Sequence, residues 1–339
     1  MWKGASMKIT SIETIHLPRG ITVHAGPIQE VSRFYSYSGW AGAEMRAISA
    51  VDIALLDLAG KAAGAPIYQL LGGASRSSIR TYNTCYDRVD FLTEPVRLAR
   101  ELLASGIRAM KIWPFDGIAR ETGGQYITAD QMRRGLEPVR LIREELGDSM
   151  DIALEFHGYW NLPSAIRIAE AVAPYAPMWL EEMLPQDNLM AYKVLSESTN
   201  LPLCLSERLM TRYGFRELLE NRAARIIMPD ICWCGGISEA KKIAMMAETY
   251  YLRVAPHNCG GPVLHCASAH LAADLTNLSI LETVRRHYLE EYKGILTAEL
   301  ALVEGLAPLP PGPGLGVELD AGLLMRPGVS VDRTSKVHS

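Results

Sequence analysis

Six ionisable residues follow one another along the chain at nearly constant intervals of 23 to 27 residues. They are Glu155, Glu181, Glu207, Asp230, His257 and Glu282. Carboxylates that converge on one point repel each other unless a cation lies between them. Ligands that offer only oxygen favour a hard ion, and Mg²⁺ fits this set best. The imidazole of His257 titrates near neutral pH and is a candidate proton acceptor, and Asp230 could hold its tautomer.

Each of the six residues lies at or just after the end of a short apolar run. The runs with strand character are IRTYNTCY, AMKIW, IALEF, MWLEE, PLCLSE, RIIMPD, RVAPHN and LSILE. Helical stretches separate them, and this alternation predicts parallel strands joined by crossover helices. Eight candidate strands favour a closed barrel over an open sheet. The ionisable residues would then gather at the carboxyl ends of the strands, where such barrels have their active sites.

The first 78 residues show a different pattern. The run KITSIETIHL alternates apolar and polar residues, which predicts a strand from Met7 to about Pro18. The segment MRAISAVDIALLDLAGKAAG has apolar residues at helical spacing, and Gly64 followed by Pro66 marks its end. The sequence therefore predicts an α+β domain over 1–78, a barrel over 79–305, a return to the first domain over about 306–330, and a polar tail over 331–339.

Composition excludes several classes of protein. The 339 residues are 48% hydrophobic and 21% charged, which is ordinary for a globular protein, and the net charge of −4 offers no basic surface for nucleic acid. No apolar stretch approaches the roughly 20 residues of a membrane helix, and the N-terminus lacks the apolar core of a signal peptide. We therefore expect no nucleic-acid or membrane partner.

The cysteines give no metal-binding pattern. They are Cys85, Cys204, Cys232, Cys234, Cys259 and Cys266. Several lie in apolar runs, and the spacing of Cys232 and Cys234 does not suit zinc without a second pair. The sequence predicts free structural thiols and a reducing, cytoplasmic location.

Eight phrases in order along the chain carry a family resemblance. They are AISAVDIALLDLAGKAAGAPIYQLLGG, MKIW, LEFHG, WLEEMLP, LSERL, MPDICWCGGIS, APHNCGGP and PGPGLGVELD. Together they resemble the enolase superfamily, in its mandelate racemase and muconate lactonizing enzyme subgroup, and particularly its galactonate-type acid-sugar dehydratases. The resemblance implies a (β/α)7β modified TIM barrel with a small α+β capping domain at the N-terminus. That domain is shorter here than the family pattern.

The resemblance also implies a metal site. Glu155, Glu181 and Glu207 match the three ligands of one Mg²⁺ ion per subunit. The first ligand is usually Asp, so Glu155 departs from the family by one methylene group. The partners implied are a sugar-acid substrate that carries a carboxylate, and further copies of the chain in a homo-oligomer.

Four further residues match the proton-transfer machinery of the family. His257 and Asp230 match its His–Asp dyad, with His257 as the base that removes the proton next to the substrate carboxylate. Glu282 matches the acid at the end of the eighth strand and, if near-neutral, could donate to a carboxylate oxygen. Lys111, at the end of the strand GIRAMKIW, would stabilise the enediolate that develops.

Two positions favour dehydration over racemisation. Racemases of the subgroup carry Lys-x-Lys on the second strand, whereas this chain has Lys111, Ile112 and Trp113, which lacks the second base. His157 lies two residues after Glu155, and strand residues two apart share a face. The pattern of Glu155 and His157 resembles the Asp-x-His of galactonate-type dehydratases, which implies that His157 protonates a leaving β-hydroxyl. The product would be a 2-keto-3-deoxy acid.

Candidate substrate contacts near the strand ends are Trp113, Tyr159 and Arg208, and His24 lies in an early loop that, by resemblance, closes over the site. Two alternatives stay open. One is a racemase, epimerase or cycloisomerase on the same scaffold, which needs a second base opposite His257. The other is a catalytically impaired barrel that only binds a sugar acid. A metallohydrolase is disfavoured because neither zinc-ligand spacing nor a nucleophile elbow is present.

Overall fold

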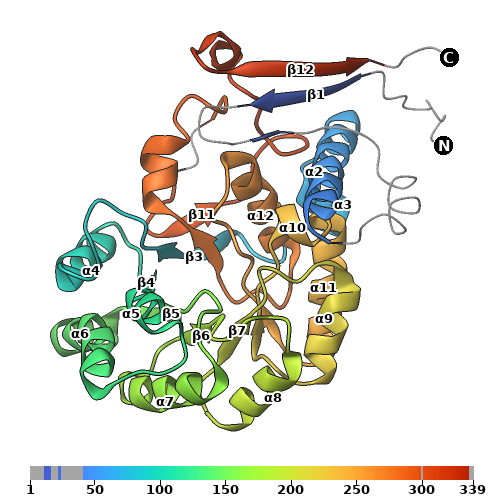
Figure 1. The fold of residues 1–339 in the computed structure, drawn as a ribbon. Coiled ribbons are helices and arrows are strands. Elements are labelled where there is room, and N and C mark those ends of the chain that lie inside the picture. The colour runs from blue at the N-terminus through green and yellow to red at the C-terminus, as the bar shows by residue number, and fades with distance from the viewer. Residues whose placement is uncertain (1–10, 17–21, 24–40, 299–300, 336–339) are drawn as a thin grey trace.

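The structure is a computed structural model, and it describes residues 11–16, 22–23, 41–298 and 301–335. Within these residues eight parallel strands form one curled sheet (Figure 1). The strands are β3 (Ser78–Thr84), β4 (Ala109–Ile112), β5 (Asp151–Glu155), β6 (Trp179–Glu181), β7 (Leu203–Leu205), β8 (Ile226–Ile227), β9 (Arg253–Val254) and β10 (Leu281–Thr283). They coincide with the eight runs expected from the sequence.

The sheet closes into a barrel. Strands β3 to β9 pair in sequence order, and β10 pairs in parallel with β3. Between β9 and β10, the amide of Val254 donates to the carbonyl of Asn277, and the amide of Ser279 donates to the carbonyl of Val254. The predicted α/β barrel is therefore confirmed.

Helices cover the outside of the barrel (Figure 1). They are α4 (Pro95–Ala104), α5 (Asp116–Thr122), α6 (Ala129–Leu146), α7 (Leu162–Val172), α8 (Leu189–Glu197), α9 (Thr211–Glu220), α10 (Ile231–Cys234), α11 (Gly236–Thr249) and α12 (Pro262–Asp274). Their starts follow local chemistry. A capping box between Thr128 and Gln131 begins α6, and the side chain of Asn161 caps α7.

The capping region packs on one side of the barrel. Its helices are α2 (Ala43–Ala63) and α3 (Ile67–Leu71), and α2 lies against α10 and α11. After the barrel the chain contacts this region again: the amide of Leu315 donates to Asp57 at 2.7 Å, and Lys61 pairs with Glu318 at 2.6 Å. Shorter elements complete the described chain: β11 (Leu306–Pro308), single turns at Gly147–Ser149, Ala173–Tyr175 and Ala321–Met325, and a π-helical turn at His287–Glu291.

A second sheet joins the two ends of the described chain. Strand β1 (Ser11–His16) pairs antiparallel with β2 (Thr22–Val23) and with β12 (Ser330–Ser335). The boundary expected at residue 331 therefore differs from the structure, in which most of the expected polar tail belongs to β12. This six-residue strand is mainly polar, so its sequence has too little apolar alternation to signal a strand.

The barrel interior explains how the ionisable residues reach their positions. Its floor is a buried cluster that includes Ala109, Ala153 and Trp179. Residues two further along a strand share the same face, so Lys111 and Glu155 lie directly above this floor. All six cysteines are free thiols, as expected.

Candidate active site

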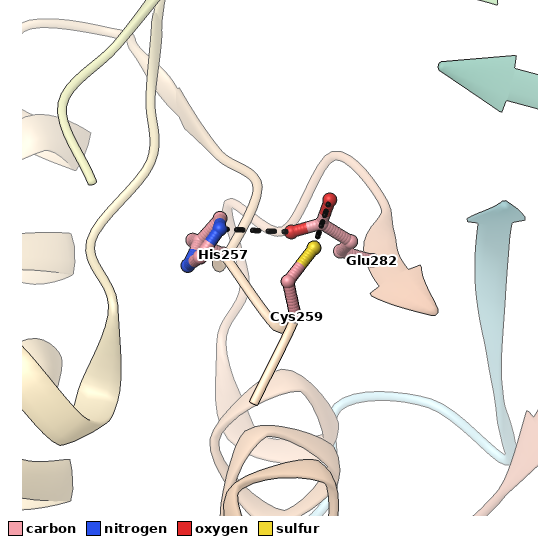
Figure 2. A group of neighbouring side chains, drawn as sticks. All are labelled: His257, Cys259 and Glu282. Carbon is pink, nitrogen blue, oxygen red and sulfur yellow. Dashed lines mark hydrogen bonds and ion pairs between the residues drawn. The ribbon is translucent and has the colours of Figure 1, made fainter. Parts of the chain in front are cut away.

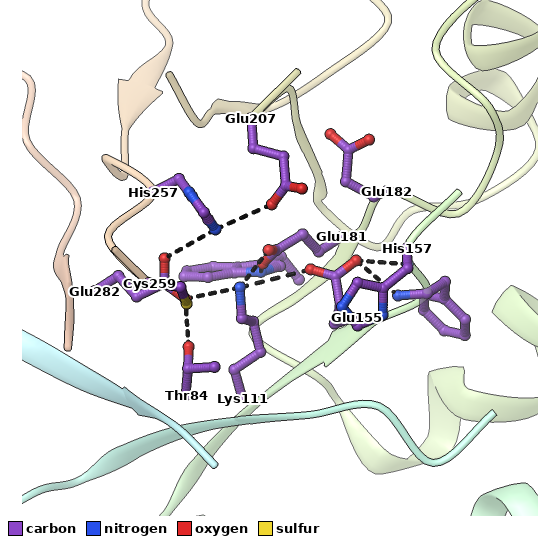
Figure 3. A network of polar contacts seen from close by, with 12 residues as sticks. Thr84, Lys111, Glu155, His157, Glu181, Glu182, Glu207, His257, Cys259 and Glu282 are labelled. Carbon is purple, nitrogen blue, oxygen red and sulfur yellow. Dashed lines mark hydrogen bonds and ion pairs between the residues drawn. The ribbon is translucent and has the colours of Figure 1, made fainter. Parts of the chain in front are cut away.

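A cavity of about 930 Å³ opens at the carboxyl ends of the barrel strands. Its lining includes residues from the predicted series, namely Lys111, Glu155, His157, Glu207, Asp230 and His257. Glu181 and Glu282 lie fully buried beside them and contact Lys111. Figure 3 shows these side chains as one network of polar contacts.

Three carboxylates form the acidic part of this network. One oxygen each from Glu155, Glu181 and Glu207 can be chosen so that all lie within 4.8 Å of one another. Burial raises the pKa of Glu155, and burial together with the charge of Glu155 raises that of Glu181 well above its usual value. A cluster of buried oxygen donors that repel one another fits a hard divalent cation.

The longer side chain at position 155 is held by the backbone. One oxygen of Glu155 accepts hydrogen bonds from the amides of Phe156 at 3.0 Å and His157 at 2.6 Å. Its other oxygen lies 3.5 Å from the Lys111 ammonium. The extra methylene group is therefore accommodated by folding the carboxylate back over the strand end, while the group stays within the cluster.

Lys111 is the cation of the network. Its ammonium contacts Glu181 and lies 2.8 Å from Glu282. Burial opposes its charge, but Glu181 and Glu282 hold its pKa well above the usual value. The surrounding carboxylates therefore favour the charged form of Lys111 at the centre of the site.

His257 and Asp230 form the expected dyad. Nδ1 of His257 lies 2.7 Å from Asp230, and Nε2 lies 3.1 Å from Glu207. Asp230 is itself fixed, because its other oxygen accepts the amide of Cys232. Burial opposes protonation of His257, but Glu207 and Glu282 outweigh it and raise its pKa well above the usual value.

Glu282 could donate to a carboxylate oxygen only if it were near-neutral, and its surroundings favour the ionised form instead. Its carboxylate contacts Thr84 and Lys111 (Figure 3) and accepts a hydrogen bond from the amide of Asn258 at 2.7 Å. It also accepts a hydrogen bond from the thiol of Cys259 at 3.3 Å (Figure 2). Burial opposes ionisation, but Lys111 and His257 hold the pKa of Glu282 below its usual range. Sequence reasoning missed these donors because they come from three separate strand ends.

His157 lies across the network from His257 (Figure 3). It has a left-handed backbone with φ of 51° directly after β5, and its ring lines the cavity. Its Nδ1 lies 2.8 Å from Asp116, and its ring meets that of Trp113 edge to face with centroids 6.0 Å apart. A strained backbone at a non-glycine residue is typical of functional positions.

Family comparison agrees with this geometry. Residues 94–323 match the enolase C-terminal domain-like family, and residues 10–72 match the mandelate racemase / muconate lactonizing enzyme N-terminal domain. The chain belongs to the enolase superfamily. An enolase of the mandelate racemase subgroup from Agrobacterium tumefaciens has a similar crystal structure, with a TM-score of 0.85 and 40% identity over 97% of this chain and 99% of that one.

Two curated relatives are dehydratases. D-gluconate dehydratase from Thermoproteus tenax is 31% identical over 82% of this chain, and D-galactonate dehydratase from Ralstonia nicotianae is 32% identical over 83%. The matches span 55% and 73% of those proteins, so the chain corresponds to about half the length of the first. Both are hydro-lyases, which agrees with the reaction class expected from the sequence. Membership of the enolase superfamily also implies a divalent metal.

Some of the residues expected to contact substrate line the cavity of this enolase-superfamily site, and others do not. Trp113 lines the cavity, whereas Tyr159 and Arg208 are not among the described residues that line it. Tyr159 instead packs near the His157 ring, and Arg208 donates to the His157 carbonyl at 3.3 Å. His24 lies outside the described residues. Across the described chain, no helix is both long and apolar enough to cross a membrane.

Several residues of the site were missed by sequence reasoning. Tyr86 and His287 line the cavity from the loops after β3 and β10, and Trp233 covers His257 with ring centroids 5.3 Å apart. Thr84 ends β3 and bonds Glu282. The register of the strand-end residues could have found Thr84, because β3 also ends in this face of the barrel. Tyr86 lies in a loop, Trp233 in the four-residue helix α10 and His287 in a π-helical turn, and these short elements give no periodic signal.

Proposed function

We propose that this protein is a Mg²⁺-dependent dehydratase of sugar acids, which removes the proton next to a carboxylate and expels the β-hydroxyl as water. The observation that carries the proposal is the placement of two histidines, His257 and His157, at opposite ends of one network around Lys111 and the carboxylates (Figure 3). A reaction that takes a proton at one carbon and gives a proton at the next needs two such groups.

The donors present fit the metal. Glu155, Glu181 and Glu207 would hold Mg²⁺, which when bound supplies positive charge to the substrate carboxylate and to the enediolate. Ligation of Glu207 would also remove the strongest carboxylate interaction that raises the pKa of His257. The pKa of His257 would then be raised less, which favours the neutral form that a base requires.

The residues of the chain perform the proton transfers. Nε2 of His257 takes the α-proton, and the bond electrons move into the enediolate, whose negative charge Lys111 stabilises. His157 protonates the β-hydroxyl, which leaves as water while the electrons of the enediolate form the new double bond. The enol that remains becomes a 2-keto-3-deoxy acid. Asp230 holds the His257 tautomer throughout.

The test is a screen of the purified protein with Mg²⁺ against aldonates, including D-gluconate and D-galactonate, and aldarates. A carbonyl reagent detects the keto product. We expect a product that chelator abolishes, and we expect His257→Asn to abolish both dehydration and exchange of the α-proton with deuterium oxide. His157→Asn should stop dehydration and leave exchange.

Other results of these experiments would indicate a different function. Deuterium that enters recovered substrate with inverted configuration, without keto product, would identify an epimerase in which His157 is the second base. Metal-dependent binding of a sugar acid without exchange or product would identify the impaired barrel. Full dehydration by His157→Asn would remove His157 from the mechanism.

A further inference from the structure

Both histidines of the site have Nδ1 close to a buried aspartate. Nδ1 of His257 lies 2.7 Å from Asp230, and Nδ1 of His157 lies 2.8 Å from Asp116. In each pair the carboxylate is buried and comes from the chain that follows the preceding barrel strand. The site therefore has a second His–Asp pair, of which sequence reasoning identified only the histidine.

Each histidine ring also meets a tryptophan. Trp233 lies against the His257 ring with centroids 5.3 Å apart, and Trp113 lies against the His157 ring at 6.0 Å. An apolar wall on one side of an imidazole and a carboxylate at Nδ1 leave Nε2 as the nitrogen that remains for a substrate. The surroundings of His157 are thus those of a proton-transfer group, like those of His257.

The burial and the contacts of Asp116 point to His157. It lies in the first turn of α5, its residue is only 4% exposed, and one of its oxygens has no hydrogen-bond partner among the described residues. A buried carboxylate is costly unless charge or hydrogen bonds compensate it. Within the same part of the chain, His157 is its ion-pair partner.

The contact between the two residues is close but not aligned. Nδ1 of His157 and Asp116 are at hydrogen-bond distance, yet the ring N–H does not point along the contact and Nδ1 makes no aligned hydrogen bond within the described chain. Such bonds in catalytic pairs often tighten only when substrate binds. Rotation of the His157 ring would align its Nδ1 hydrogen with Asp116.

We propose that Asp116 is a positioning residue for His157. It accepts the Nδ1 hydrogen, fixes the ring so that Nε2 faces the substrate, and stabilises the imidazolium. When Nε2 gives its proton to the departing hydroxyl, the Nδ1 hydrogen stays on the ring, and the products are water and a neutral imidazole. This role rests on the proposed function, in which His157 is the acid.

Asp116→Asn tests the role because it keeps the shape of the side chain and removes its charge. We expect dehydration of the sugar acid found in the screen to fall about 100-fold or more, with α-proton exchange into deuterium oxide within about threefold of wild type. General damage to the site would lower both rates together. Asp130→Asn, an exposed aspartate on α6, is the matched control and should change neither rate.

Two further measurements keep the proposal falsifiable. Asp116→Glu retains the charge and should recover more dehydration than Asp116→Asn. In protein with ¹⁵N-labelled histidine, Asp116→Asn should shift the ring nitrogens of His157, assigned with His157→Gln, and leave those of His257 unchanged. Unshifted His157 signals, or equal loss of exchange and dehydration, would overturn the role of Asp116. Wild-type protein that dehydrates nothing would instead refute the proposed function, and the ring signals would still decide the contact.

Discussion

Replacement of Lys111 by methionine removes the cation that lies among three buried carboxylates. The ammonium contacts Glu181, lies 2.8 Å from Glu282 and lies 3.5 Å from Glu155. Loss of one partner from a buried ionic cluster costs about 3–5 kcal/mol, because the remaining charges stay desolvated. For a chain of 339 residues that corresponds to a fall in melting temperature of roughly 4–7 °C.

The size of this effect depends on pH. In the wild type the folded-state pKa of Glu282 lies below its unfolded value, so its contribution to stability is present above the unfolded pKa and is lost as pH falls. Without Lys111, burial raises the folded-state pKa of the carboxylates, and they can take up protons at mildly acidic pH. The variant should therefore lose more stability at pH 7.5 than at pH 5.

The assay is thermal unfolding of Lys111→Met and wild type in chelator, at both pH values. Lys242→Met is the matched control, since Lys242 is half-exposed and lies 3.7 Å from Glu239. It should melt within about 1–2 °C of wild type, as surface ion pairs contribute little. A Lys111→Met protein that melts like the control, or whose deficit is equal at both pH values, would refute the electrostatic reasoning.

Three other outcomes follow from the structure. Mg²⁺ at about 100 times its dissociation constant should stabilise the wild type by about 3 kcal/mol, and Glu181→Gln should lose this shift in a thermal melt. Burial lowers the pKa of His265 to about 4. The neutral ring therefore contributes roughly 3 kcal/mol to the free energy of unfolding above about pH 6.5, and this contribution is lost as pH falls toward 4. His265→Gln should flatten the plot of stability against pH in that range. Gly124→Ala should cost more stability in denaturant titrations than Gly123→Ala, because a Cβ at Gly124 would lie 1.8 Å from the Tyr159 carbonyl, whereas one at Gly123 meets nothing within 4 Å although both have positive φ. Equal losses for the two alanine variants, an unchanged profile for His265→Gln, or a retained Mg²⁺ shift would each contradict its prediction.

The regular part of the fold was predictable because its signal repeats. Eight apolar runs with an ionisable residue near the end of most of them define both the barrel and the face on which those residues meet. The rule that strand residues two apart share a face placed Lys111 and Glu155 over the barrel floor. Glu207 and Arg208 lie in a turn beyond the end of β7, so strand alternation does not decide which of them faces the cavity; among the described residues Glu207 lines it and Arg208 does not.

The irregular part was not predictable from one sequence. A short turn connects β4 to Asp116, and His157 follows the neighbouring strand β5. Their contact depends on the register of those two strands and on the left-handed backbone of His157. No local pattern of residues encodes the strand register or this backbone conformation, so the sequence alone could not identify Asp116 as the partner of His157.

The departure at position 155 links the metal cluster to the candidate acid. The carboxylate of Glu155 accepts the amide of His157 at 2.6 Å and also lies within the cluster of Glu181 and Glu207. The backbone strain at His157 is offset in part by this hydrogen bond to a charged group, which is stronger than one between neutral groups. A change that draws the Glu155 carboxylate toward or away from a cation must therefore also act on the strand end that carries His157. If Glu155 holds a cation and His157 is the acid, binding of the cation and the position of the acid would be coupled through the Glu155 side chain.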